Sequence, residues 1–158
     1  MKRITAIRKI MRNISSRTVV VASNGMVSRD LFWSCDRDLN FYMMGSMGCA
    51  LAIGVGIAYA RPDLMVKVIS GDGSAMMSLN TMALHKKMGL VNLTHIILDN
   101  NAHATTGGQP TCSDVVDFKS LAPRTIVWKI ANEKGKSARI PIKPIDIQRR
   151  FKDAICNL

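Results

Sequence analysis

The sequence predicts an α/β fold, a three-layer doubly wound parallel sheet, from three observations. First, short β-branched apolar runs typical of buried strands alternate with longer segments of helical period. Second, the 158 residues are 47% hydrophobic and 21% charged, which suits one domain with its own core. Third, turn-forming polar residues follow the strands, and open α/β sheets bind ligands at that edge. We therefore expect residues 1–158 to form a single domain.

Four segments have the pattern of strands, and the first three have that of strands buried inside a sheet. Each is a run rich in Val, Ile and Leu that is bounded by turn residues, as strands of parallel sheets are. These segments are Thr18–Ala22, Leu64–Ser70, Leu93–Leu98 and Thr125–Ile130.

Residues 2–14 have the period of an amphipathic helix, and we expect Ile4, Ile7, Ile10 and Met11 to face inward. The first 29 residues contain seven Lys and Arg and no acidic residue. That composition is also typical of an organelle transit peptide. Of the two interpretations, the sequence favours the structural helix.

Further helices are expected to start near Ser28–Trp33 and to cover Cys49–Ala60, Ala75–Met88 and Ile145–Cys156. The uncharged stretch Phe41–Ala60 is about long enough to span a bilayer. Its glycines instead favour a tight GSMG loop followed by a buried helix of small residues.

The net charge of +11 suits an anionic partner without choosing among phosphate esters, nucleic acid and acidic lipid. Basic residues are not interleaved with aromatic ones and no nucleic-acid-binding motif is present, so we expect no nucleic-acid partner and no membrane partner. The four cysteines have no CxxC spacing. We expect reduced, mostly buried thiols in a cytoplasmic protein.

Three polar loops should meet at the carboxyl edge of the sheet: SNG (Ser23–Gly25), GDGS (Gly71–Ser74) and DNN (Asp99–Asn101). Glycines let the backbone approach a phosphate closely. Asp72 offers a hard oxygen, and Asn100 follows 28 residues later, one strand–helix–strand unit on. Both could join diphosphate oxygens around Mg²⁺. The alternative is that Asp72 only caps a helix beginning at Ser74.

These motifs carry a family resemblance. FYMMGSMG (Phe41–Gly48), GDGS and DNNAHATTGGQPT (Asp99–Thr111) together resemble the diphosphate-binding half of phosphonopyruvate decarboxylases, which are thiamine diphosphate enzymes. Sulfopyruvate decarboxylases are close relatives that are often split into two short subunits. The resemblance covers about Arg17 to Ala122 and resumes weakly near Thr125.

The resemblance implies a role for each matching position. The metal, Mg²⁺, would be bound by the side chains of Asp72 and Asn100 and the carbonyl of Ala102. Met47 would press between the two rings of thiamine diphosphate, and it and His103 are the expected catalytic residues. The cofactor-binding residues implied are Ser23, Asn24, Gly25, Gly45, Ser46, Met47, Gly71, Asp72, Gly73, Ser74, Asn100 and Ala102.

The sequence allows two interpretations for each of two basic side chains, His103 and Arg29. His103 could contact the substrate anion or donate a proton, or it could be a loop histidine with no special task. Arg29 could steer a doubly charged substrate, although a solvated helix arginine is the simpler interpretation. His85 and His95 fall on a predicted helix and a predicted strand, where we expect structural roles.

The family's chemistry requires a glutamate that this half does not supply. Glu133 is the only glutamate, and it lies in the late basic segment NEKGK. The resemblance therefore implies a pyrimidine-binding partner subunit that provides the glutamate, and a hetero-oligomer. The implied substrate is an anionic 2-keto acid, most simply 3-phosphonopyruvate, with sulfopyruvate as the alternative.

The chain departs from the family after DFKSLA (Asp117–Ala122). The family would continue with a helix, a strand and a further helix, whereas Pro123-Arg124 leads almost at once into the final predicted strand. Roughly 30 residues are missing by the size of such a unit. We expect a sheet with an exposed edge or a gap. A catalytically inactive truncated homologue or a basic binding protein is the alternative of another class.

Overall fold

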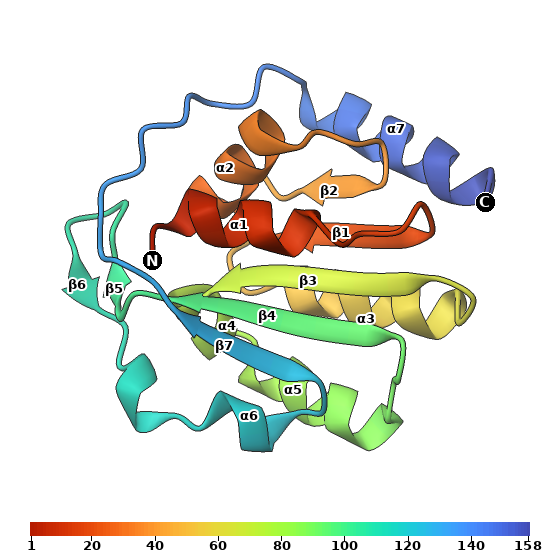
Figure 1. Cartoon of the computed structure of the whole chain (residues 1–158). Helices are drawn as coiled ribbons and strands as arrows, with labels where there is room; N and C mark the ends of the chain where they lie inside the picture. Colours follow the sequence, from red (N-terminus) through yellow and green to blue (C-terminus); the bar gives the residue numbers. More distant parts are fainter.

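The computed structural model describes residues 1–158 and contains a five-stranded parallel sheet in the order β2-β1-β3-β4-β7 (Figure 1). A separate two-stranded antiparallel hairpin, β5-β6, follows β4. The strands are β1 (Thr18–Ala22), β2 (Asn40–Tyr42), β3 (Met65–Gly71), β4 (Leu93–Asp99), β5 (Ala102–His103), β6 (Gln109–Pro110) and β7 (Thr125–Lys129).

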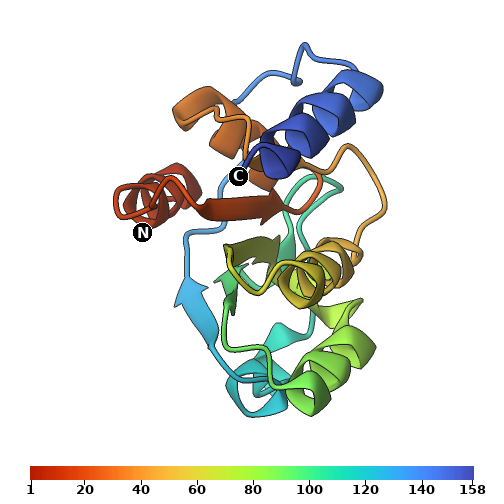
Figure 2. The same cartoon turned by 90° about the vertical axis from the view of Figure 1, so that its right-hand side faces the viewer.

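Helices cover both faces of the sheet, so the predicted three-layer α/β architecture is confirmed (Figure 2). One face carries α1 (Arg3–Met11) and α2 (Met26–Ser34). The other face carries α3 (Ala50–Ala60), α4 (Asp72–Met76), α5 (Leu79–Met88) and α6 (Phe118–Leu121). The last helix, α7 (Pro144–Cys156), lies beside β2 at the edge of the sheet (Figure 1).

Two hydrophobic cores lie on the two sides of β1, because successive strand residues point to opposite faces. Val19 and Val21 join the core under α3, while Val20 and Ala22 join the core under α1 and α2. All five residues of β1 are buried. This explains why the strand has no polar alternation in its sequence.

The two segments with competing interpretations both form packed helices. In α1, Ile7, Ile10 and Met11 are buried as predicted, and Ile4 is half-buried. In α3, the small residues Ala50, Gly54 and Ala58 are buried, as the small-residue pattern predicts. None of the helices has both the length and the apolar character that crossing a membrane requires.

Three local expectations were wrong. A three-residue strand, β2, lies at Asn40–Tyr42, where none was predicted. The helix expected over Ala75–Met88 is divided into α4 and α5, since the Ser78 hydroxyl donates to the carbonyls of Ser74 and Ala75. The thiols are not mostly buried: Cys35 is half-buried, and Cys49, Cys112 and Cys156 are exposed and free.

The shortened C-terminal region gives the sheet the exposed edge that we expected. α6 leads through Pro123-Arg124 directly into β7, which pairs only with β4. Ile126 on this edge strand is 40% exposed. After β7, residues 131–143, which we call the C-terminal strap, run past the carboxyl edge of the sheet to α7 (Figure 1).

Two buried histidines should make the fold sensitive to acid. Burial lowers the pKa of His95 to about 3, with His85 as a second cause, and burial also lowers the pKa of His85. The unfolded chain takes up protons below a pH of about 6.5 while the folded chain stays neutral at these sites. The free energy of unfolding should therefore fall on acidification from pH 6.5 to 4, by up to about 1.4 kcal/mol per pH unit for His95. The lowered pKa of His85 adds to the fall in the same direction.

Urea unfolding at several pH values measures this slope. His95→Gln should make it shallower, because glutamine binds no proton in this pH range. Glutamine can also keep the contact that His95 Nε2 makes with Ser70 Oγ at 3.0 Å. An unchanged slope in this variant would contradict the assignment to His95.

Candidate active site

The three polar segments converge at one edge of the sheet, as predicted, although GDGS is not a loop: Gly71 ends β3 and Asp72 begins α4. Ala22 pairs with Ile69, and Gly71 pairs with Leu98, so β1, β3 and β4 end nearly level. A cavity of about 120 Å³ lies where their loops meet. The predicted site residues that line it are Ser23, Asn24, Gly25, Met47, Gly71, Asp72, Gly73, Ser74, Asn100, Ala102 and His103.

Both predicted catalytic side chains lie over Gly73. A Cβ atom placed on Gly73 would lie 2.7 Å from Cε1 of His103 and 2.9 Å from Cε of Met47. A side chain at this position would displace the end of the imidazole or of the thioether. Glycine in the GDGS motif thus leaves the space in which Met47 and His103 lie together at the cavity.

Asp72 is a buried carboxylate, 2% exposed, that has no cationic partner in any ion pair of the structure. It is the first residue of α4, whose N-cap is Gly71, so the alternative that Asp72 caps a helix at Ser74 is wrong. Its Oδ2 accepts a hydrogen bond from the Thr111 hydroxyl. A buried carboxylate without a counter-charge is costly. Its position at the cavity wall suits a cation ligand.

The charge of a second aspartate, Asp99, is neutralised by an ion pair with Lys129. Its Oδ2 accepts from Lys129 Nζ at 2.5 Å, and its Oδ1 accepts from Ser113 Oγ and the Asn101 amide, both at 2.9 Å. Burial alone would raise the pKa of Asp99, but the hydrogen bonds from Lys129 and Ser113 outweigh it and lower the pKa below its usual value. Asp99 is therefore ionised and structural.

Thr111 and Ser113 are the residues that sequence reasoning missed. They stand 39 and 41 positions from Asp72, and the β5-β6 hairpin returns them to it. The motif GGQPT drew attention to the loop, but a hydroxyl side chain in a loop carries no signal of its own partner.

Asn100 and Ala102 offer oxygens to the same cavity. Asn100 is half-buried, and its Nδ2 donates to Asn132 Oδ1 of the C-terminal strap at 3.2 Å, so the amide oxygen remains available. The Ala102 carbonyl accepts from the Ala104 amide at 3.0 Å and retains a second lone pair. No cluster of three His, Cys, Asp or Glu side chains could hold a metal by itself. Any metal here would depend on amide, carbonyl and ligand oxygens.

Gly45 and Ser46 are the predicted site residues that do not line the cavity. Both are exposed on the loop before α3. The loop is nevertheless tied to the GDGS turn, because the Gly48 amide donates to Ser74 Oγ at 3.1 Å. Glu133, the only glutamate, lies on the strap and also does not line the cavity.

Comparison with known proteins agrees with this geometry. Residues 12–155 match the family model of the thiamine pyrophosphate enzymes, C-terminal TPP binding domain. The chain belongs to this family. The match extends through β7, the strap and most of α7, and so includes the part near Thr125 where the motifs gave only a weak resemblance.

Named relatives resemble the two decarboxylase groups that the motifs indicated. The chain is 41% identical to a phosphonopyruvate decarboxylase of Streptomyces hygroscopicus over 120 residues, 76% of this chain and 30% of the relative. It is 32% identical to a sulfopyruvate decarboxylase subunit beta of Methanocaldococcus jannaschii over 183 positions, 98% of this chain and 97% of the relative. The chain thus spans about a third of the length of the phosphonopyruvate decarboxylases that it matches.

The second alignment also supports the internal shortening. It runs over 183 positions, whereas this chain has 158 residues, so at least 25 positions of the relative have no counterpart here. This agrees with the direct passage from α6 to β7.

The uncompensated charge of Asp72 predicts a stability change in the ligand-free protein. Asp72→Asn keeps an oxygen that can accept from Thr111 and removes the buried charge. The free energy of unfolding should therefore rise by about 1 kcal/mol. Thermal and urea unfolding without divalent cations measure it. Asp99→Asn is the matched control and should lower stability, because Asp99 has Lys129 as partner. Equal losses in both variants would contradict this account.

Proposed function

We propose that this chain is a subunit of a thiamine diphosphate- and Mg²⁺-dependent 2-keto acid decarboxylase that converts 3-phosphonopyruvate into phosphonoacetaldehyde and CO₂. Residues 1–158 form its diphosphate-binding domain. The observation that carries the proposal is the cavity where the buried, unpaired Asp72 meets Asn100, Ala102 and the GDGS turn. Membership of the family supports thiamine diphosphate as the cofactor.

The residues of the cavity fit a magnesium diphosphate. Mg²⁺ prefers hard oxygens and keeps ligand phosphates in its shell. Asp72, the Asn100 amide oxygen and the Ala102 carbonyl supply three such oxygens, as the resemblance implies. The backbone of the GDGS motif and of Ser23–Gly25 would hold the diphosphate, because amide groups there can donate to its oxygens.

The remaining cofactor contacts come from the loop before α3. In our proposal the Gly45 carbonyl and the Met47 amide contact the aminopyrimidine, with Ser46 beside them, and the Met47 side chain separates the two rings. When bound, thiamine diphosphate supplies the nucleophilic carbon and the electron sink for decarboxylation. His103 lies next to Met47 over Gly73, where it can contact the substrate or donate a proton.

A pyrimidine-binding partner subunit completes the site. The chemistry needs a carboxylate against the pyrimidine, and Glu133 lies outside the cavity. The exposed Gly45 and Ser46 are available to contacts from another chain. Relatives named as beta subunits support a hetero-oligomer. Free cysteines support a cytoplasmic location.

Sulfopyruvate is the second candidate substrate. The Methanocaldococcus jannaschii relative named as a sulfopyruvate decarboxylase subunit beta aligns over 97% of its length with 98% of this chain. That match in extent favours the two-subunit organisation, whereas identity over the shared segment is higher for the phosphonopyruvate relative.

Reconstitution tests the function. The chain is mixed with the pyrimidine-binding chain of the same organism, thiamine diphosphate and Mg²⁺, and aldehyde release is measured from phosphonopyruvate, sulfopyruvate and pyruvate. We expect turnover with the highest kcat/KM for phosphonopyruvate, and its loss in Asp72→Ala because a metal ligand is removed.

The other outcomes decide among the alternatives. A higher kcat/KM for sulfopyruvate selects the second candidate. Unchanged activity in Asp72→Ala would reject the metal assignment. Absence of Mg²⁺-dependent cofactor uptake in calorimetry would reject the decarboxylase proposal. Salt-dependent binding to DNA without such uptake would instead favour a basic binding protein.

Thr111 should set the affinity for the metal. Its hydroxyl donates to Asp72 Oδ2 and so restricts the rotation of the carboxylate, whose other oxygen is left for a metal ion. Thr111→Val should raise the Mg²⁺ concentration needed for half-maximal cofactor uptake about tenfold or more, and Thr111→Ser should restore it. Calorimetric titration of Mg²⁺ at fixed thiamine diphosphate measures the effect. Identical affinities in the Val and Ser variants would show that the hydroxyl has no such role.

A further inference from the structure

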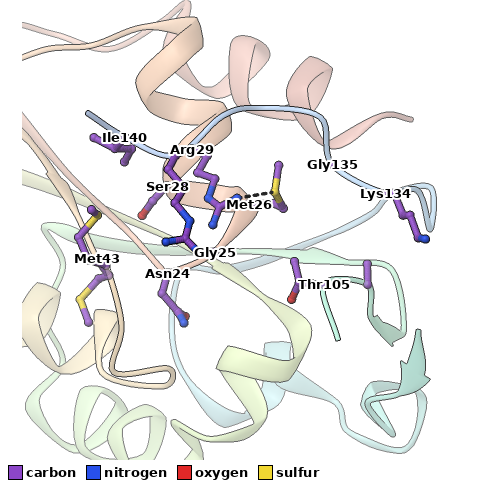
Figure 3. A pocket seen from close by; sticks show the side chains of 13 residues that line it. Asn24, Gly25, Met26, Ser28, Arg29, Met43, Thr105, Lys134, Gly135 and Ile140 are labelled. Carbon is purple, nitrogen blue, oxygen red and sulfur yellow. Dashed lines mark hydrogen bonds between the residues drawn. The ribbon is translucent and has the colours of Figure 1, made fainter. Parts of the chain in front are cut away.

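A second, larger cavity of about 820 Å³ adjoins the cofactor cavity (Figure 3). The two share Asn24, Gly25 and Met26 at the start of α2, and Ala104 and Thr105 after β5. A molecule in the larger cavity could therefore reach the cofactor site without crossing the sheet or a helix.

The larger cavity is lined by three cations and no acidic residue. Arg29 comes from α2, and Lys134 and Arg139 come from the C-terminal strap. None of the three takes part in an ion pair. The only side-chain hydrogen bond among them is a weak one, from Arg29 Nη1 to Met26 Sδ at 4.0 Å (Figure 3). Unpaired guanidinium groups are suited to bind a phosphonate or sulfonate with two donors at once.

Asp30, the acidic residue next to Arg29 in the sequence, already has an ion-pair partner. Asp30 is buried, and its Oδ2 accepts from Arg3 Nε at 2.7 Å while its Oδ1 accepts from Ser137 Oγ at 2.6 Å. Arg3 therefore neutralises Asp30, and the charge of Arg29 is left for a ligand.

The strap holds its cations at the cavity by fixed contacts. Besides the bond from Ser137 to Asp30, Trp33 Nε1 donates to the Ala138 carbonyl at 3.1 Å, and Ile140 is buried. Gly135 packs against Met26 and Arg3 with no room for a side chain. Lys134 and Arg139 thus flank anchored positions and do not belong to a free tail.

We propose that this cavity binds the second anionic group of the substrate, the phosphonate or sulfonate, through Arg29 and Arg139 with Lys134 at its side. This inference rests on the proposed decarboxylase function, since that function makes the substrate a dianion or trianion. The diphosphate of the cofactor has its own place beside Asp72. The three cations have no ion-pair partner in the chain, and two of the residues that the cavities share, Ala104 and Thr105, directly follow His103.

The kinetic test uses the reconstituted enzyme and compares phosphonopyruvate with pyruvate, which lacks the second anion. Arg29→Gln and Arg139→Gln should raise KM for phosphonopyruvate about tenfold, the loss expected for one hydrogen bond to a charged group. The ratio of kcat/KM for phosphonopyruvate to that for pyruvate should fall by the same factor. Arg139 is exposed and takes part in no ion pair within the chain, so its variant should fold even if the Arg29 variant does not.

Lys136→Gln is the matched control, because Lys136 is exposed on the same strap, carries the same charge and does not line the cavity. It should leave KM unchanged. Arg29→Lys should recover only part of the affinity, since an amine keeps the charge without the paired donors. If KM rose equally in the Arg29, Arg139 and Lys136 variants, the effect would come from net charge alone, and the proposal would be overturned.

A binding test separates this proposal from the proposed function. Methylphosphonate, which cannot be decarboxylated, is titrated by calorimetry into the full chain with its partner, saturated with Mg²⁺ and thiamine diphosphate. Binding that is lost in Arg139→Gln and kept in Lys136→Gln supports the cavity even if no keto acid turns over. Turnover with unchanged KM in both arginine variants, or loss of partner association in them by sedimentation, would overturn the anion pocket and leave the decarboxylase proposal in place.

Discussion

The parallel pairing of β1, β3 and β4 is the constraint on which the rest of the structure depends. Ala22 lies beside Ile69, and Gly71 lies beside Leu98, so three loops from distant parts of the chain end at one height. The register is held by the two cores, because β1 is buried on both faces and a slip of one residue would exchange its sides. The cavity is therefore formed by apolar packing, before any ligand contributes.

The polar groups at this edge divide into compensated and uncompensated charges. Asp99 has Lys129 and Asp30 has Arg3, and both pairs hold loops or helices in place. Asp72 has only hydroxyl donors, although it is just as buried. Functional sites commonly retain such a cost, because the group that destabilises the empty protein is the group that binds the ligand.

The late part of the chain both completes the fold and shapes the site. The passage from α6 to β7 leaves β7 as an exposed edge, and α7 protects the opposite edge beside β2. The strap that joins them must cross the carboxyl edge, since parallel strands end there and α7 lies on the far side (Figure 1). The passage from α6 to β7 agrees with a shortening of this chain compared with the sulfopyruvate decarboxylase subunit beta of Methanocaldococcus jannaschii. The strap that follows β7 brings Lys134 and Arg139 to the cavity.

The sequence by itself determined the strands β1, β3, β4 and β7 to within a residue or two, and it grouped Asp72 with Asn100, because apolar runs and motif spacing are local signals. It could not find β2, which has only three residues, or the break at Ser78. Only the tertiary structure decided that Thr111 supports Asp72 and that cations of α2 and the strap share a cavity. These contacts join residues that are far apart in the chain. They form only because the helices, the β5-β6 hairpin and the strap pack around the sheet.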